Sequence, residues 1–141
     1  MKVQEILENY NSLKVSVTIA IGDILTLKRE IGDIKSTNLD GMPKAKGYTS
    51  SNLEEQVINV NEKIEKKQSY INQTTRNLEI VEGLVKTLKK YNQDIIDMRF
   101  YQMMSIEEIA TKKNRNYGSI QKTIDRSIKI MQKEYNKYKM S

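Results

Sequence analysis

Residues 53–88 carry a heptad pattern that limits the folds open to this chain. Nine apolar and two polar residues recur in alternating steps of four and three: Leu53, Val57, Val60, Ile64, Lys67, Ile71, Thr74, Leu78, Val81, Val85 and Leu88. This spacing is typical of a coiled-coil seam, in which one side of a long helix packs against another helix. The polar positions can set the register or the oligomeric state. The pattern predicts one long helix with a buried stripe.

A second long helix is predicted for residues 3–35, where apolar residues also recur every three or four positions: Ile6, Tyr10, Leu13, Val17, Ile21, Ile24, Leu27, Ile31 and Ile34. Residues 36–50 hold the only Pro and two of the six Gly, which predicts a loop. Ser50 or Ser51 can cap the helix that follows. The two stripes predict an antiparallel helical hairpin. A second copy of the chain is an alternative partner, which would make a homodimer through the long helices.

Residues 105–120 have the pattern of two short helices joined by a tight turn. Ser105 and Glu108 have the spacing of a capping box at the start of the first helix. Ala110 is a small residue where the two helices would cross. Asn114 suits a left-handed turn residue, and Asn116 can cap the second helix. An apolar stripe follows at Ile120, Ile124, Ile128 and Met131. Upstream, Asp94 is predicted to cap a short helix that begins at Ile95.

This arrangement is that of a helix-turn-helix, which reads DNA with its second helix. The side of the second helix opposite its apolar stripe, with the end of the turn, carries polar and basic residues able to bond to bases and phosphates. The predicted DNA-binding residues are Arg115, Asn116, Tyr117, Ser119, Gln121, Lys122, Arg126 and Lys129. Tyr117 can equally pack on Ile106.

The positive charge of the chain is concentrated at this end. Its net charge is +6, and residues 105–141 hold nine Lys and Arg against four acidic residues. Residues 1–104 hold 15 basic and 14 acidic residues and are almost neutral. The asymmetry favours a polyanionic partner, here double-stranded DNA, although a lysine-rich solvated surface would have the same composition.

Three groups of motifs resemble known bacterial and phage proteins. The run Ser105–Ala110, the turn, Gly118–Ile120 and the downstream pair Ser127-Ile128 resemble region 4 of bacterial sigma factors and their phage-encoded relatives. Met98–Tyr101 is similar to the Leu-Arg-Tyr motif that opens the same domain. Leu39–Lys44 with Ser51–Glu54 resembles the Met-Pro, then Ser-x-x-Glu signature of phage late-gene transcriptional activators of the RinA/ArpU type. Together these motifs span most of residues 37–131.

The resemblance implies a phage or prophage transcriptional regulator that binds promoter DNA and contacts host RNA polymerase. The predicted fold is all-α: a helical hairpin or oligomerisation arm over residues 1–90, with the loop at 36–50, and a sigma region 4-like helix-turn-helix domain over residues 91–141. Two residues depart from the family pattern. Lys113 and Arg115 stand in the turn where apolar residues are usual. The core under the turn must then be thinner, or a neighbouring helix must fill it.

Several classes of function have no support in the residues. The chain has no Cys and no His, which removes disulfides, thiolate nucleophiles and the usual zinc ligands. No carboxylate spacing suggests an active site, so we expect no enzyme, no metal and no cofactor. The most apolar run, Val15 to Leu27, contains Asp23 and is short for a membrane span. No signal peptide is predicted, and the composition fits the bacterial cytoplasm.

Two alternatives to a DNA-binding regulator remain open at this stage. The first is a protein-interaction module, in which the hairpin is the functional part and a degenerate helix-turn-helix grips RNA polymerase or another host protein. The second is a small terminase subunit, which also joins a helix-turn-helix to an oligomerising helical region. The sequence does not indicate the DNA target or the direction of regulation.

Overall fold

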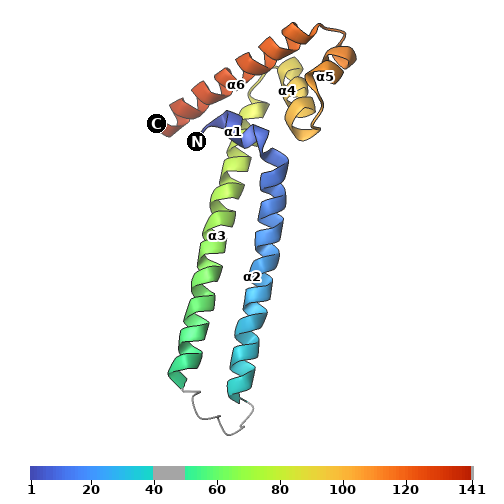
Figure 1. Cartoon of the computed structure of the whole chain (residues 1–141). Helices are drawn as coiled ribbons and strands as arrows, with labels where there is room; N and C mark the ends of the chain where they lie inside the picture. The colour runs from blue at the N-terminus through green and yellow to red at the C-terminus, as the bar shows by residue number, and fades with distance from the viewer. Residues whose placement is uncertain (40–49, 141) are drawn as a thin grey trace. The chain divides into compact units, whose positions relative to one another are not determined.

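The computed structural model describes residues 1–39 and 50–140, and these residues form an all-α fold without strands (Figure 1). Its elements are the α-helices α1 (Val3–Glu8), α2 (Tyr10–Leu39), α3 (Ser50–Lys86), α4 (Lys90–Ile96), α5 (Ile106–Lys113) and α6 (Tyr117–Met140), with a π-helical turn η1 (Asp97–Tyr101) directly after α4. The prediction of an all-α fold is therefore confirmed.

The structure corrects three predicted helix boundaries. The helix predicted for residues 3–35 is interrupted at Asn9, whose side-chain amide donates to the carbonyl of Glu5 at 2.8 Å. Residues 36–39, predicted as part of the loop, are helical because α2 continues through Gly32 to Leu39. Asp94 does not cap a helix, since α4 already begins at Lys90. The rest of the predicted loop, residues 40–49, lies outside the described residues, and so do the side chains of Ser50 and Ser51.

Residues 15–74 form one of two compact units, in which α2 and α3 run side by side in opposite directions (Figure 1). Ala20 and Ile24 of α2 pack with Ile71 of α3. Ile21, which was predicted to belong to this stripe, is 48% exposed, whereas Ala20 is only 6% exposed. The buried stripe passes through Ala20 because the steps Leu13, Val17, Ala20, Ile24 and Leu27 keep one side of α2 turned to α3.

The heptad seam of α3 is buried as its spacing predicts. All eleven seam positions are buried or half-buried. The polar position Lys67 has a partner, because its ammonium lies 3.1 Å from the carboxylate of Asp23 on α2. A further polar contact joins the hydroxyls of Ser16 and Tyr70 at 2.6 Å. These contacts fix which residues of the two helices lie opposite each other in this unit.

Residues 1–14 and 75–141 form the second compact unit. Its largest fully buried side chains come from four helices: Leu7, Ile95, Ile96, Ile109, Ile120 and Met131. The end of α3 contributes Val81 and Val85 to the same core, and Leu88 follows from the segment after α3. The compact units therefore do not divide at the predicted domain boundary after residue 90.

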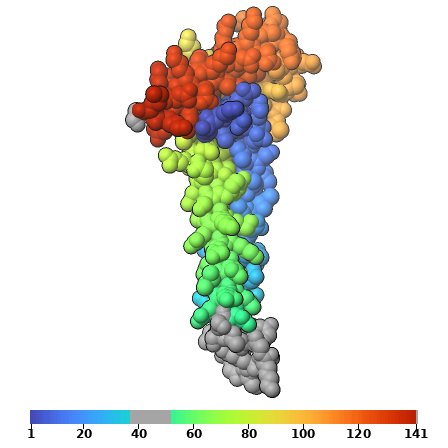
Figure 2. Space-filling view, turned by 60° about the vertical axis from the view of Figure 1, so that its left-hand side comes forward, coloured from blue at the N-terminus to red at the C-terminus, as the bar shows by residue number. Residues whose placement is uncertain are grey.

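The N-terminal helix α1 belongs to the core of this second unit. Val3 and Leu7 are almost completely buried, and α1 lies against α6 in two views (Figures 1 and 2). Gln132 of α6 accepts from the backbone N–H of Val3 at 2.8 Å and donates to the carbonyl of Met1 at 3.2 Å. The interruption at Asn9 separates α1 from α2, and α1 covers part of α6.

Candidate nucleic-acid interface

Helix α5 begins with the predicted capping box. The Ser105 hydroxyl accepts from the backbone N–H of Glu108 at 3.1 Å, and the Glu108 carboxylate accepts from the backbone N–H of Ser105 at 3.5 Å. Two backbone donors that would otherwise lack partners are thus satisfied at the helix start. Glu107 and Glu108 also place negative charge at this end, which the helix dipole favours.

The turn from α5 to α6 takes only three residues, 114–116. Asn114 adopts the predicted left-handed conformation, with φ 54° and ψ 48°. The backbone N–H of Arg115 then donates to the carbonyl of Ala110 at 2.9 Å, which closes the end of α5. The Asn116 side chain accepts from the backbone N–H of Ser119 at 2.7 Å and caps α6 as predicted.

We expect Asn114→Ala to destabilise the protein by about 1 kcal/mol, because an alanine side chain disfavours the left-handed conformation. Asn114→Gly removes the same side chain without that steric conflict and serves as the matched control. Urea unfolding followed by circular dichroism measures both variants. An alanine variant as stable as the glycine variant would contradict this role of the turn.

One apolar core joins α5 to α6. Ile109 and Ile120 are completely buried, and Ala110 and Ile124 are 8% and 4% exposed. The predicted inward sides of both helices are therefore turned to the same core. This packing leaves the opposite side of α6 to the solvent.

Lys113 has a role that the sequence did not predict. Its ammonium lies 3.6 Å from the carboxylate of Asp94 on α4 and 5.6 Å from the centre of the Tyr91 ring. Its side chain is only 22% exposed. The charge of Lys113 is thus paired with an acidic residue of the neighbouring helix α4. Arg115, the other departure from the family pattern, is exposed.

The two lysines near Asp94 also affect its acidity. A hydrogen bond from Lys90, together with the charges of Lys90 and Lys113, lowers the pKa of Asp94 below its ordinary value of 3.8. A carboxyl whose pKa is lowered on folding stabilises the folded state at higher pH. This contribution is lost as the pH falls through the lowered pKa.

We expect Lys90→Gln to raise the pKa of Asp94 towards its ordinary value, and Lys113→Gln to raise it by a smaller amount. The difference follows because the hydrogen bond from Lys90 is the largest cause of the shift. Carboxyl NMR titration measures the pKa directly. Lys89→Gln removes an adjacent exposed charge as a control, and an equal effect of all three variants would contradict the specific pairing.

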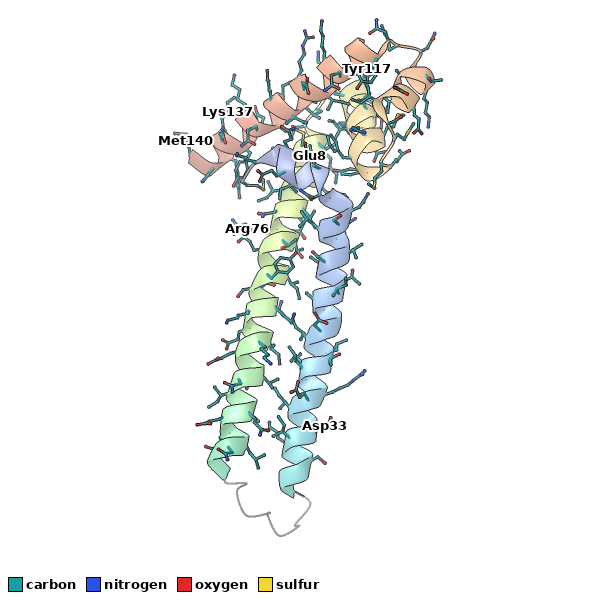
Figure 3. The ribbon with its side chains drawn as sticks, in the orientation of Figure 1. Glu8, Asp33, Arg76, Tyr117, Lys137 and Met140 are labelled. Atoms are coloured by element: carbon teal, nitrogen blue, oxygen red, sulfur yellow. The ribbon has the colours of Figure 1, made fainter. Side chains whose placement is uncertain are left out.

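The outward side of α6 presents a row of basic side chains. The row begins with Lys122, Arg126 and Lys129, all predicted and all exposed. The predicted DNA-binding residues end at Lys129, but α6 continues to Met140. Lys133 and Lys137 therefore extend the same row in steps of four. Long side chains project from α6 on the side away from α1, and Lys137 is labelled near its end (Figure 3).

The five basic residues cover a long stretch of one helix. From Lys122 to Lys137 the row spans about 22 Å at ~1.5 Å per residue. The regular spacing was the signal in the sequence that could have revealed the last two members. Two acidic residues also lie on α6, and both have contacts of their own: Asp125 accepts from the Gln121 amide at 3.3 Å, and Glu134 lies 3.5 Å from Lys137.

The other predicted DNA-binding residues lie at the start of α6 and in the turn before it. Arg115, Asn116 and Tyr117 are exposed, and Ser119 and Gln121 are half-buried. Tyr117, labelled in Figure 3, is 52% exposed. The structure thus brings all eight predicted residues to the turn and the first four turns of one helix. Asn116 and Gln121 use side-chain atoms in contacts within the chain.

No helix of the described residues combines the length and apolar character needed to cross a membrane. In the same part of the chain, no group of three or more acidic side chains is placed to hold a metal ion. Comparison with models of protein families, with curated proteins and with solved structures finds no match for this chain. The resemblance to sigma factor region 4 and to phage activators therefore stays a prediction from the quoted residues.

Proposed function

We propose that this protein binds double-stranded DNA through α5, the turn and α6, and regulates transcription. The observation that carries the proposal is the row of five basic residues on the solvent side of α6, whose other side is buried against α5. Such a row is complementary in charge to the phosphates of a duplex. The helix that carries the row begins directly after the turn. Asn114 ends α5 and Asn116 caps α6, so the first residues of α6 have a defined position.

The geometry of a helix-turn-helix assigns different tasks to the two halves of the row. The major groove admits one α-helix, and the N-terminal residues of that helix approach the base edges. Tyr117, Ser119 and Lys122 lie there. Lys129 and Lys133 lie two to four turns further along, where contacts to phosphates are the natural role. Base contacts specify a sequence, whereas phosphate contacts position the helix.

The regulatory part of the proposal rests on resemblance. The motifs at residues 98–101 and 105–128 resemble a domain that binds promoter DNA in sigma factors and phage activators. A phage or prophage regulator that also contacts host RNA polymerase would fit this likeness. The net positive charge of the last 37 residues supports a nucleic-acid partner independently of it.

A salt titration of DNA binding tests the proposal. Fluorescence anisotropy of a labelled duplex measures the affinity of the full chain as the salt concentration is raised. If the five basic residues contact phosphates, the logarithm of the binding constant should fall by about 4 to 5 for each tenfold increase in salt. Absence of binding at ~50 mM salt, or an affinity that does not depend on salt, would overturn the proposal.

A further inference from the structure

Gly118 is the second residue of α6, and no contact within the described chain requires a glycine there. Its backbone is helical, so no left-handed turn depends on it. Beyond its chain neighbours and the helix backbone, a Cβ atom built on Gly118 would meet one atom, Asn116 Oδ1, at an ordinary contact distance of 3.7 Å. The cap of α6 joins Asn116 to Ser119 and leaves Gly118 out. Alanine would favour the helix more than glycine does.

The place of Gly118 on α6 connects it with the basic row. Lys122 follows four residues further on and Arg126 eight, so Gly118 lies on the same side of the helix as the row and precedes its first member. The opposite side carries the buried Ile120. Gly83 of α3 has equally open surroundings, but of the glycines that the structure describes, Gly118 alone lies in α6.

The outward side of α6 changes in height along the helix. It has no side chain at Gly118, whereas long basic side chains stand on it from Lys122 onward. A lysine or arginine holds a phosphate away from the helix backbone by the length of its side chain, but a glycine lets a neighbouring group touch the backbone itself. A duplex on this side of α6 can therefore come closest at the start of the helix.

We infer that DNA contacts the backbone of α6 at Gly118, and that the missing side chain is what lets base edges come this close. The inference rests on the proposed DNA binding and deepens it, because it names a residue on which base reading depends. The first residues of a helix in the major groove approach the base edges, and the neighbouring Tyr117 is 52% exposed. The basic row attracts any duplex, whereas contact at Gly118 selects among sequences.

Duplexes selected from a random-sequence pool by the full chain provide the probe. The wild type should enrich a shared motif and should bind a selected duplex at least about tenfold more tightly than a random duplex. Gly118→Leu should lose this preference, because its side chain would hold the base edges away from α6. The same variant should keep the affinity and the salt dependence measured with the random duplex, since the five basic residues are unchanged.

Gly83→Leu is the matched control, because it makes the same change at an equally open glycine of another helix. It should keep the preference of the wild type. Gly118→Ala adds a smaller group and should reduce the preference by a smaller factor than Gly118→Leu. Urea unfolding should find both Gly118 variants at least as stable as the wild type, because alanine and leucine favour a helix more than glycine does. A lost preference then reports on the contact with DNA and not on folding.

The outcomes separate this inference from the proposed function. A wild type that binds all duplexes equally, or a Gly118→Leu variant that keeps the full preference, would overturn the role of Gly118 and leave salt-dependent DNA binding intact. An equal loss of preference in Gly83→Leu would also overturn it, because the loss would not depend on the position of the glycine. Absence of binding to every duplex at ~50 mM salt would overturn the proposed function, and this inference with it.

Discussion

Replacing all five basic residues of the outward side of α6 by glutamine is expected to remove most of the affinity for duplex DNA. The residues are Lys122, Arg126, Lys129, Lys133 and Lys137. Each phosphate contact releases about 0.9 of a condensed counterion, so five contacts contribute roughly four orders of magnitude to the binding constant at ~0.1 M salt. The variant should also lose nearly all of the salt dependence. Fluorescence anisotropy against the same labelled duplex measures both quantities.

A control variant separates the position of the charge from its amount. Glutamine at five exposed basic residues of α3 and the segment after it changes the net charge equally: Lys63, Lys66, Arg76, Lys86 and Lys89. We expect this variant to keep the salt dependence of the wild type, because these side chains are not part of the row on α6. Equal losses of DNA affinity in the two variants would mean that binding depends only on the net charge of the protein.

The largest effect on stability is expected for Ile120→Ala, at about 2–5 kcal/mol. Ile120 is completely buried between α5 and α6, so truncation leaves a cavity as well as losing apolar burial. Ile130→Ala is the matched control in the same helix, since Ile130 is 47% exposed and a smaller change in burial follows. Urea unfolding gives the free energy of unfolding of both variants. Similar losses would show that Ile120 does not pack as described.

The sequence predicted the features that depend on residues three or four positions apart. The heptad seam of residues 53–88 is buried or half-buried at every position, because a helix brings such residues to one side whatever its partner is. The capping box at Ser105, the left-handed Asn114 and the cap at Asn116 are confirmed for the same reason. Each depends on hydrogen bonds or sterics within one turn of the chain. Most of the candidate interface could therefore be predicted, since it lies on one helix and the turn before it.

Features that depend on contacts distant in the sequence were missed. The packing of α1 depends on contacts with α6 more than 120 residues away, such as that from Val3 to Gln132. The pairing of Lys113 with Asp94 requires α4 to lie beside the end of α5. Gln132 and Asp94 cannot be recognised as partners from their spacing in the sequence, because each is a single polar residue among many.

What the sequence by itself determined was therefore the helices, their caps and the existence of apolar stripes. Which stripe is buried was decided by the tertiary structure. On α2 the spacing allowed Ile21 or Ala20 to face inward, and only the packing against Ile71 turned Ala20 to the core and left Ile21 to the solvent. Helix periodicity is a local property of the backbone, whereas the choice of the buried side depends on the area that a neighbouring helix covers.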